Sequence, residues 1–182
     1  MNAYVFLADG FEETEAIAPI DILRRSGLSV TTVSIMGRKM VNGSHGIPVE
    51  ADALFEETDF SQAAMLVLPG GMPGTKNLDA HEGLRDLLSS AAEKNVVIGA
   101  ICAAPSVLGN LGLLNGEKAT CFPGFEDYLI GADVKKDPVV VSHNFVTSRG
   151  AGTALQFGFA LSAQMKGVDF ANDLARNMEF AQ

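Results

Sequence analysis

Short apolar, β-branched runs alternate with helical patterns along this chain, and that alternation restricts the fold more than any other feature of the sequence. Continuous apolar runs of this kind are typical of strands buried on both faces of a sheet. We expect strands at residues 4–7, 30–35, 65–68, 96–101, 139–143 and 145–148. We expect helices at residues 13–26, 81–94, 106–111, 152–166 and 169–180. This order predicts a mainly parallel sheet with helices on both faces.

No internal repeat, linker or low-complexity stretch divides the 182 residues, so we expect a single domain spanning residues 1–182. A flavodoxin-like three-layer α/β sandwich is the simplest fold that satisfies the pattern. Glycines punctuate residues 36–52, which predicts a small hairpin added to the sheet. Pro19 lies inside the first helical pattern, where it predicts a kink or a late helix start.

Composition excludes several kinds of partner. The formal net charge is −9 and Lys and Arg are not clustered, which argues against nucleic acid. No apolar run approaches the roughly 18 residues that cross a bilayer, so we expect no membrane segment. The start of the chain lacks the pattern of a signal peptide. Together with only two cysteines, this predicts free thiols in the cytoplasm, and no ligand cluster predicts a metal.

Cys102 occupies the most informative segment, where the buried strand 96–101 runs directly into a helix. This arrangement is typical of a nucleophile elbow, a tight turn that exposes one side chain above the sheet. A helix N-terminus favours a thiolate there, and the amide of Ala103 is well placed to stabilise an oxyanion. A buried, inert cysteine is the alternative at this position.

Two other loops follow strands and should meet Cys102 at the carboxyl edge of the sheet. One contains Gly70 and Gly71, whose backbone amides can approach a ligand; Gly71 is the better candidate for a second oxyanion donor. The alternatives there are a phosphate nest or a plain turn. The other loop contains Glu12, Glu13 and Glu15, all at a helix start.

Capping the helix is the simplest role for Glu12 and Glu13, because carboxylates are favoured at helix N-termini. Glu15 precedes the inward-facing part of the helix, so we expect it to be buried at the strand ends. Burial would raise the pKa of Glu15 and suit it to move a proton. Capping remains the alternative for Glu15 as well.

The histidines give no clear partner for a cysteine hydrolase. His45 lies in the predicted hairpin, His81 opens a helix and His143 ends a strand, so each is expected to be structural or solvated. Cys121 is expected to pack in the core.

Four segments together resemble the ThiJ/PfpI superfamily, in particular the branch of the parkinsonism-associated protein deglycase and its bacterial relatives. They are residues 8–15, 68–71, 100–105 and 147–153, and they follow in order over nearly the whole chain. The resemblance implies a flavodoxin-like sandwich and a homodimer that needs no cofactor. It implies Cys102 as nucleophile, Glu15 as protonated partner, and an oxyanion pocket formed by the backbones of Gly71, Cys102 and Ala103.

Three functions follow as expectations. The resemblance implies an enzyme acting on 2-oxoaldehydes such as methylglyoxal and glyoxal, or on early glycation adducts. A redox sensor or chaperone that works through Cys102 oxidation is the alternative. An amidase or peptidase is third, because Phe122 stands before Pro123 where several relatives of the superfamily carry a histidine. The sequence leaves open the physiological substrate, the assembly beyond a dimer and the role of residues 36–52.

Overall fold

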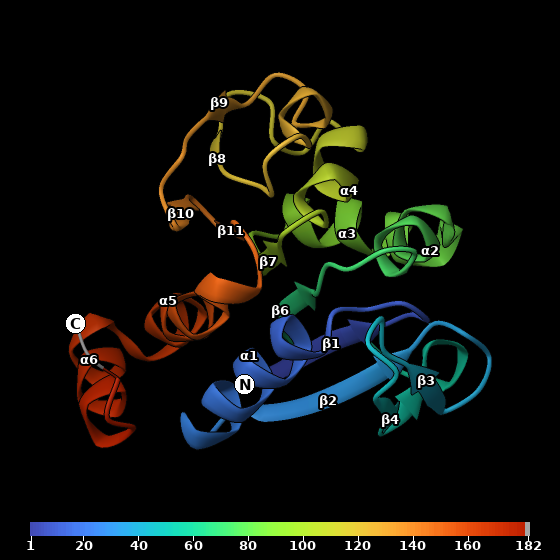
Figure 1. Ribbon diagram of the computed structural model, residues 1–182, viewed down its shortest axis with the longest axis horizontal. Coiled ribbons are helices and arrows are strands. Elements are labelled where there is room, and N and C mark those ends of the chain that lie inside the picture. The colour runs from blue at the N-terminus through green and yellow to red at the C-terminus, as the bar shows by residue number, and fades with distance from the viewer. Residues whose placement is uncertain (181–182) are drawn as a thin grey trace.

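The computed structural model describes residues 1–180, in which a seven-stranded sheet lies between two layers of helices (Figure 1). Its strands are β1 (Asn2–Leu7), β2 (Ser29–Ser34), β5 (Ala53–Leu54), β6 (Ala63–Leu68), β7 (Val97–Ile101), β10 (Val139–Ser142) and β11 (Phe145–Ser148). Their order is β10-β11-β7-β6-β1-β2-β5, and every neighbouring pair is parallel except β10 with β11. The predicted flavodoxin-like three-layer sandwich is therefore confirmed.

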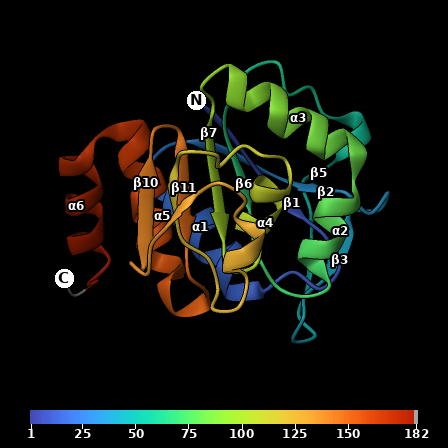
Figure 2. The same cartoon turned by 90° about the horizontal axis from the view of Figure 1, so that it is seen from above.

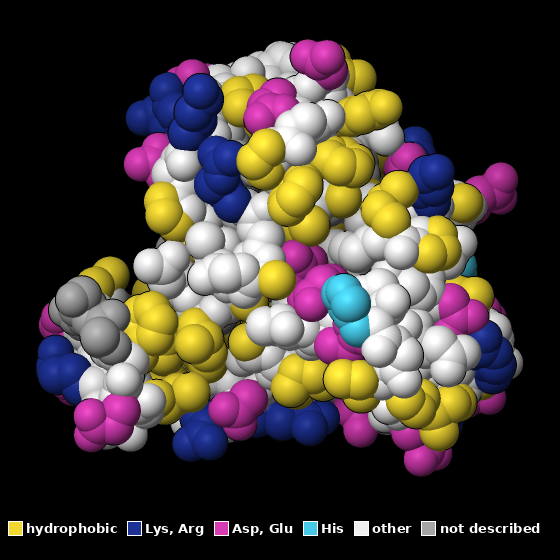
Figure 3. Space-filling view, viewed as in Figure 1, with side chains coloured by type: hydrophobic (Ala, Val, Ile, Leu, Met, Phe, Trp, Pro, Cys, Tyr) yellow, Lys and Arg dark blue, Asp and Glu magenta, His cyan; other side chains and the backbone are white. Residues whose placement is uncertain are grey.

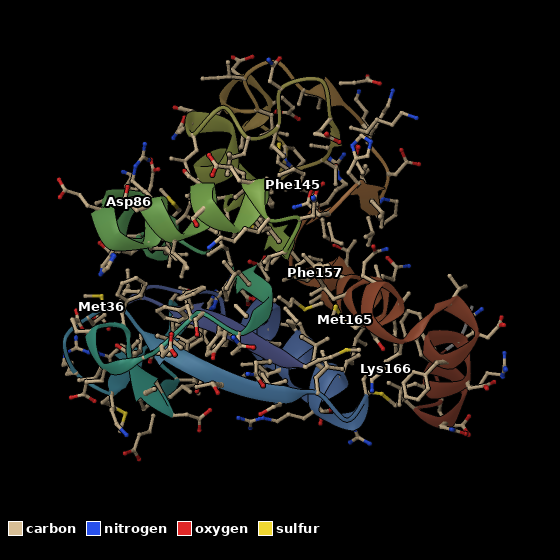
Figure 4. All side chains as sticks on the ribbon, turned by 180° about the vertical axis from the view of Figure 1, so that it is seen from behind. Met36, Asp86, Phe145, Phe157, Met165 and Lys166 are labelled. Atoms are coloured by element: carbon tan, nitrogen blue, oxygen red, sulfur yellow. The ribbon has the colours of Figure 1, made fainter. Side chains whose placement is uncertain are left out.

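Two hydrophobic cores separate the sheet from its helices. One core lies under α2 (Gly74–Ala80), α3 (Glu82–Glu93) and α4 (Pro105–Asn110), and the other lies under α1 (Glu13–Arg25) and α5 (Ala154–Lys166). Phe145 belongs to the first core and Phe157 to the second (Figure 4). Alternate residues of β1 enter the two cores, since successive side chains of a strand point to opposite faces. Both faces are thus buried, as the continuous apolar runs predict.

The remaining elements lie at the periphery. The last helix, α6 (Val168–Asn177), packs on α5 at one end of the molecule (Figure 2). Short 3-10 turns are η1 (Phe55–Glu57), η2 (Glu126–Tyr128) and η3 (Ala151–Thr153), and a small parallel pair joins β8 (Lys118–Ala119) to β9 (Asp133–Val134). No helix among residues 1–180 is both long enough and apolar enough to span a membrane.

The predicted hairpin is present within residues 36–52, but it forms a separate two-stranded sheet and is not attached to the main sheet as the sequence predicts. Strands β3 (Met40–Asn42) and β4 (Pro48–Glu50) pair antiparallel. The hairpin rests on the loop that follows β1, because the Gly10 N–H donates to the Asn42 carbonyl and the Ser44 N–H donates to the Phe11 carbonyl, each at 2.8 Å. The hairpin therefore braces the segment that leads to Glu15.

Two local expectations differ from the structure. Helix α1 begins at Glu13 and runs through Pro19 without the expected late start, because the Glu12 side chain accepts a 2.7 Å hydrogen bond from the Glu15 N–H and caps it. Proline removes only one interior hydrogen bond, and packing against α5 keeps the helix intact. The sequence does not predict helix α2, because the pattern at Gly74 indicates the end of a glycine-rich turn.

Candidate active site

Three loops meet at the carboxyl edge of the parallel strands, following β1, β6 and β7. The Glu12 N–H, in the loop after β1, donates to the Gly70 carbonyl at 2.9 Å in the loop after β6. Acidic side chains gather in the middle of this face beside a histidine, below a group of hydrophobic side chains (Figure 3). The loops meet as the parallel topology predicts.

Gly70 and Gly71 allow this close approach. A Cβ added at Gly70 would lie 2.6 Å from both the Cys102 Cβ and the Glu15 Oε2, closer than real Cβ contacts. Gly71 has a φ of +90°, and a Cβ there would lie 2.4 Å from the Glu12 nitrogen. Only glycines fit here, because a larger side chain would separate the carboxyl group from the thiol.

Cys102 has a φ of +65°, an uncommon conformation for a residue with a side chain. The Cys102 N–H donates to the Ser148 carbonyl at 2.9 Å, and the Cys102 carbonyl accepts from the Phe122 N–H at 2.8 Å. These bonds hold the strained turn from both sides. The side chain remains partly exposed, which is the geometry expected of a nucleophile elbow.

Glu15 is buried, with only 1% of its surface exposed. Its Oε2 accepts a 3.0 Å hydrogen bond from the Gly70 N–H, and its carboxyl group also hydrogen-bonds with the Cys102 thiol. Backbone N–H groups of Gly71 and Ala103 donate to the Cys102 sulfur. The five candidate residues from the sequence, Glu15, Gly70, Gly71, Cys102 and Ala103, thus lie together.

Burial, assisted by the charge of Glu12, raises the pKa of Glu15 to about 7, although hydrogen bonds from Cys102 and Gly70 lower it. Water no longer solvates the carboxylate, so the protonated acid persists to neutral pH. This pKa puts Glu15 in the range in which a general acid or base works best at neutral pH.

The pKa of the Cys102 thiol differs from the sequence-based expectation. The sequence predicts a lowered pKa, because Cys102 lies at a turn before a helix. In the structure burial, together with the charge and hydrogen bond of Glu15, raises the pKa of Cys102 to about 12. The Gly71 and Ala103 amides only partly offset this effect. The prediction of a free thiolate at Cys102 is therefore wrong when Glu15 is ionised.

The thiol and carboxyl groups must be treated as one coupled pair. Glu15 loses its proton near pH 7 whereas the Cys102 thiol has a pKa of about 12, so above neutral pH the two groups hold one proton between them. When that proton lies on Glu15, the sulfur is a thiolate that accepts hydrogen bonds from Gly71 and Ala103. When it lies on sulfur, Gly70 stabilises the carboxylate.

Phe122 and Gly150 lie close to the carboxyl group of Glu15. A Cβ added at Gly150 would lie 3.3 Å from the Phe122 ring and 3.9 Å from the Glu15 Oε1. The aromatic ring and the carboxyl group therefore lie near the same backbone position. The ring of Phe122 supplies no proton donor to the thiol.

No histidine hydrogen-bonds to Cys102 within residues 1–180. His45 pairs with Glu13 at 2.9 Å, the His81 Nδ1 accepts from the Leu84 N–H at 3.0 Å, and His143 pairs with Glu117 at 2.7 Å. All three have the structural or solvated roles expected of them. Cys121 packs in the core under α4, as predicted, whereas Cys102 packs against the opposite core.

Glu13 has a role that the sequence did not reveal. Instead of capping α1, its buried carboxylate accepts hydrogen bonds from the backbone N–H groups of His45, at 2.7 Å, and Ile47, at 3.4 Å, and from the His45 ring. Although burial opposes ionisation, these bonds lower the pKa of Glu13 to about 2. Glu12, Glu13 and His45 place possible metal-ligand atoms within 4.8 Å of one another, but the hairpin contacts account for that clustering.

Comparison with known proteins now places the chain. The model of the DJ-1/PfpI family matches residues 1–164. The chain belongs to the DJ-1/PfpI family. This membership confirms the resemblance drawn from the four sequence motifs.

Individual members of the DJ-1/PfpI family are similar over most of the chain. DJ-1 homolog B of Arabidopsis thaliana is 38% identical over 171 residues, which are 93% of this chain and 39% of the plant protein. A deglycase of Pyrococcus abyssi is 32% identical over 154 residues, 84% of this chain and 92% of that protein. Oxidized DJ-1 of Toxoplasma gondii has a TM-score of 0.95 at 33% identity, covering 100% of this chain and 99% of that one. The chain thus spans less than half of the plant relatives it matches.

The raised pKa of Glu15 predicts a pH-dependent gain in stability for Glu15→Gln. As pH rises from about 4.5 to about 7, the unfolded carboxyl group loses its proton before the folded one, so wild-type stability falls. At pH 8 the variant should have a free energy of unfolding about 3 kcal/mol above wild type, and at pH 4 the difference should vanish. Urea unfolding at both pH values measures it.

Glu50→Gln on the exposed surface of β4 is the control and should show no such pH-dependent gain. Parallel pH profiles for Glu15→Gln and wild type would contradict a raised pKa at Glu15.

Proposed function

We propose that the protein converts small 2-oxoaldehydes, such as methylglyoxal and glyoxal, or early glycation adducts, to hydroxy acids. The observation that carries this proposal is the buried Glu15–Cys102 pair, which shares one proton beside the amides of Gly71 and Ala103. The similarity to a deglycase of Pyrococcus abyssi supports a protective role of this kind. No organic cofactor or metal enters the chemistry proposed.

The first step joins sulfur to the aldehyde carbon. In the form with the proton on Glu15, the Cys102 thiolate adds to the carbonyl and forms a C–S bond. The N–H groups of Gly71 and Ala103 stabilise the oxyanion, which then takes the proton of Glu15 to give a hemithioacetal. Glu15 is left as a carboxylate, ready to act as a base.

The second step moves a hydrogen between adjacent carbons. The Glu15 carboxylate removes the proton from the former aldehyde carbon, which forms an enediolate, and returns it to the neighbouring carbon. The hydroxyl proton of the hemithioacetal moves to the neighbouring oxygen. The product is a thioester of the hydroxy acid, because the aldehyde carbon has been oxidised and the ketone carbon reduced. Water then hydrolyses the thioester, which releases the hydroxy acid and restores the shared proton.

Incubation with methylglyoxal tests this proposal, with lactate as the measured product. Wild type should form lactate, Cys102→Ser should form none above background, and Glu15→Gln should lose about 100-fold or more in kcat/KM, as is typical of a missing general base. Glu50→Gln is the matched control and should retain wild-type rates. Equal lactate formation by wild type and Cys102→Ser would overturn the proposal.

Redox sensing through Cys102 is the second candidate. The favouring observation is that the partly exposed sulfur lies against a carboxyl group that is still protonated near neutral pH, which can donate to the oxygens of an oxidised sulfur. A Toxoplasma gondii DJ-1 of similar structure is described as oxidized. An amidase or peptidase is less well supported, since no histidine among residues 1–180 contacts the thiol.

Graded peroxide followed by intact-mass measurement tests the sensor. Cys102 should gain two oxygen atoms at peroxide levels that leave the buried Cys121 unchanged, and Glu15→Leu should lower the yield of that species severalfold. Equal oxidation of the two cysteines would contradict a sensing role. Selective oxidation together with aldehyde turnover would support both functions, which do not exclude one another.

We also propose a homodimer in the cytoplasm. The two free thiols are typical of a reducing compartment. For the dimer, Ile17 on α1 and Ile47 in the hairpin are large exposed hydrophobic residues near the site. Light scattering should report a dimer for wild type, a monomer for Ile17→Lys, and a dimer for the control Ile130→Lys, which alters an exposed residue after η2. A monomeric wild type would contradict the assembly.

A further inference from the structure

A pocket of about 300 Å³ opens between α2, α4 and the turn η2. It is separate from the residues of the candidate active site. The lining residues are Met72, Thr75, Lys76, Asp79, Ser106, Asn110, Gly124, Phe125 and Tyr128. A volume of this size lies at the lower end of the range for small-molecule sites, so it suits part of a ligand.

The chain joins this pocket to the candidate active site at three points. Met72 directly follows Gly71, whose N–H donates to the Cys102 sulfur. Ser106 donates from its hydroxyl to the carbonyl of Ala103, at 2.7 Å. Gly124 lies two residues beyond Phe122, whose N–H binds the Cys102 carbonyl. The pocket therefore adjoins the loops and the turn that surround the Cys102 sulfur.

The pocket has an apolar wall and a buried polar floor. Met72 and Tyr128 are 42% and 51% exposed, which is high for large hydrophobic side chains, and Phe125 packs beside Tyr128 with 5.9 Å between ring centroids. Thr75 and Ser106 are only 3% and 7% exposed. An apolar ligand would cover the wall, and a polar group on that ligand would meet the floor.

The floor contains unused hydrogen-bonding capacity. The Thr75 hydroxyl is buried and has no hydrogen-bond partner within residues 1–180. Buried hydroxyl groups nearly always have one, and a threonine in a helix readily adopts two side-chain rotamers. The Thr75 side chain can therefore rotate its hydroxyl group toward a ligand without breaking a hydrogen bond. Ser106 donates its proton to Ala103, so its oxygen can still accept from a ligand.

The charges at the rim do not favour an ionic ligand. The Asp79 carboxylate pairs with Arg85 at 2.5 Å and accepts from the Asn110 amide at 2.9 Å. Lys76 is exposed, so water screens its charge. An uncharged ligand suits this balance better than a carboxylate or a phosphate.

We propose that this pocket is a subsite for an uncharged, mainly apolar arm of the substrate that carries a hydroxyl group, such as a hydroxyphenyl arm. The hydroxyl would donate to Ser106 and accept from Thr75, while the ring lies between Met72 and the aromatic pair of Phe125 and Tyr128. As a substrate subsite the pocket rests on the proposed function. The preference of the pocket for this class of arm is independent of the proposed function, because binding requires no reaction.

Binding is tested with p-cresol on the Cys102→Ser protein, in which no covalent step can occur, using toluene as the matched probe without a hydroxyl. Titration followed by NMR should give saturable p-cresol binding in the millimolar range or tighter. Thr75→Val in the same background should weaken p-cresol at least fivefold, as expected for one lost hydrogen bond, with little effect on toluene.

Thr120→Val is the matched control. The Thr120 hydroxyl is likewise buried without a partner, but it does not line the pocket. Both valine variants should fold, because each replaces an unpartnered hydroxyl with a methyl group of similar shape. Only Thr75→Val should change p-cresol binding.

Turnover gives the second measurement, as the ratio of kcat/KM for 4-hydroxyphenylglyoxal to that for phenylglyoxal. This ratio should fall about fivefold in Thr75→Val and stay unchanged in Thr120→Val. Absence of p-cresol binding, or equal binding in Thr75→Val, would overturn the subsite. Saturable, Thr75-dependent binding without turnover of any aldehyde would instead support the pocket's preference for this class of arm and overturn the proposed reaction.

Discussion

The hydrogen bond between the Glu15 carboxyl group and the Cys102 thiol is the constraint on which the rest of the site depends. Each group can ionise, yet they lie together where burial limits their contact with water, so only one negative charge is favoured. Burial raises both pKa values, and the backbone amides around the pair only partly compensate. The result is one proton held between the thiol and the carboxyl group, which is what the proposed conversion of a 2-oxoaldehyde uses.

The surrounding fold can be understood as what keeps this pair together. Gly70 lacks a side chain because any Cβ would lie between the thiol and the carboxyl group. Cys102 is held in its uncommon conformation by hydrogen bonds to two neighbouring segments. The hairpin of residues 36–52, whose role could not be read from the sequence, is tied by Glu13 to the start of the helix that carries Glu15. The hairpin thus braces the start of the helix that carries the Glu15 carboxyl group.

Much of this arrangement could be predicted from the sequence because it follows from local patterns. Continuous apolar strands required a sheet buried on both faces, and parallel strands brought Glu15, Gly71 and Cys102 to one edge. What could not be predicted depends on distances between segments. The sequence indicated a lowered pKa at Cys102 from its place before a helix, whereas the neighbouring carboxyl group and burial raise it. The sequence indicates a capping role for Glu13, because no feature of the neighbouring residues shows that the hairpin folds onto this side chain.

Direct titration of the Glu15 carboxyl group is the sharpest test of the shared proton. Carbon-13 NMR of labelled glutamate, assigned by comparison with Glu15→Gln, follows that group through the pH range. A proton shared by Glu15 and Cys102 predicts a main titration step near pH 7 that moves when Cys102 is replaced by serine. A single step at the ordinary value for glutamate, about 4.3, unchanged in Cys102→Ser, would contradict it.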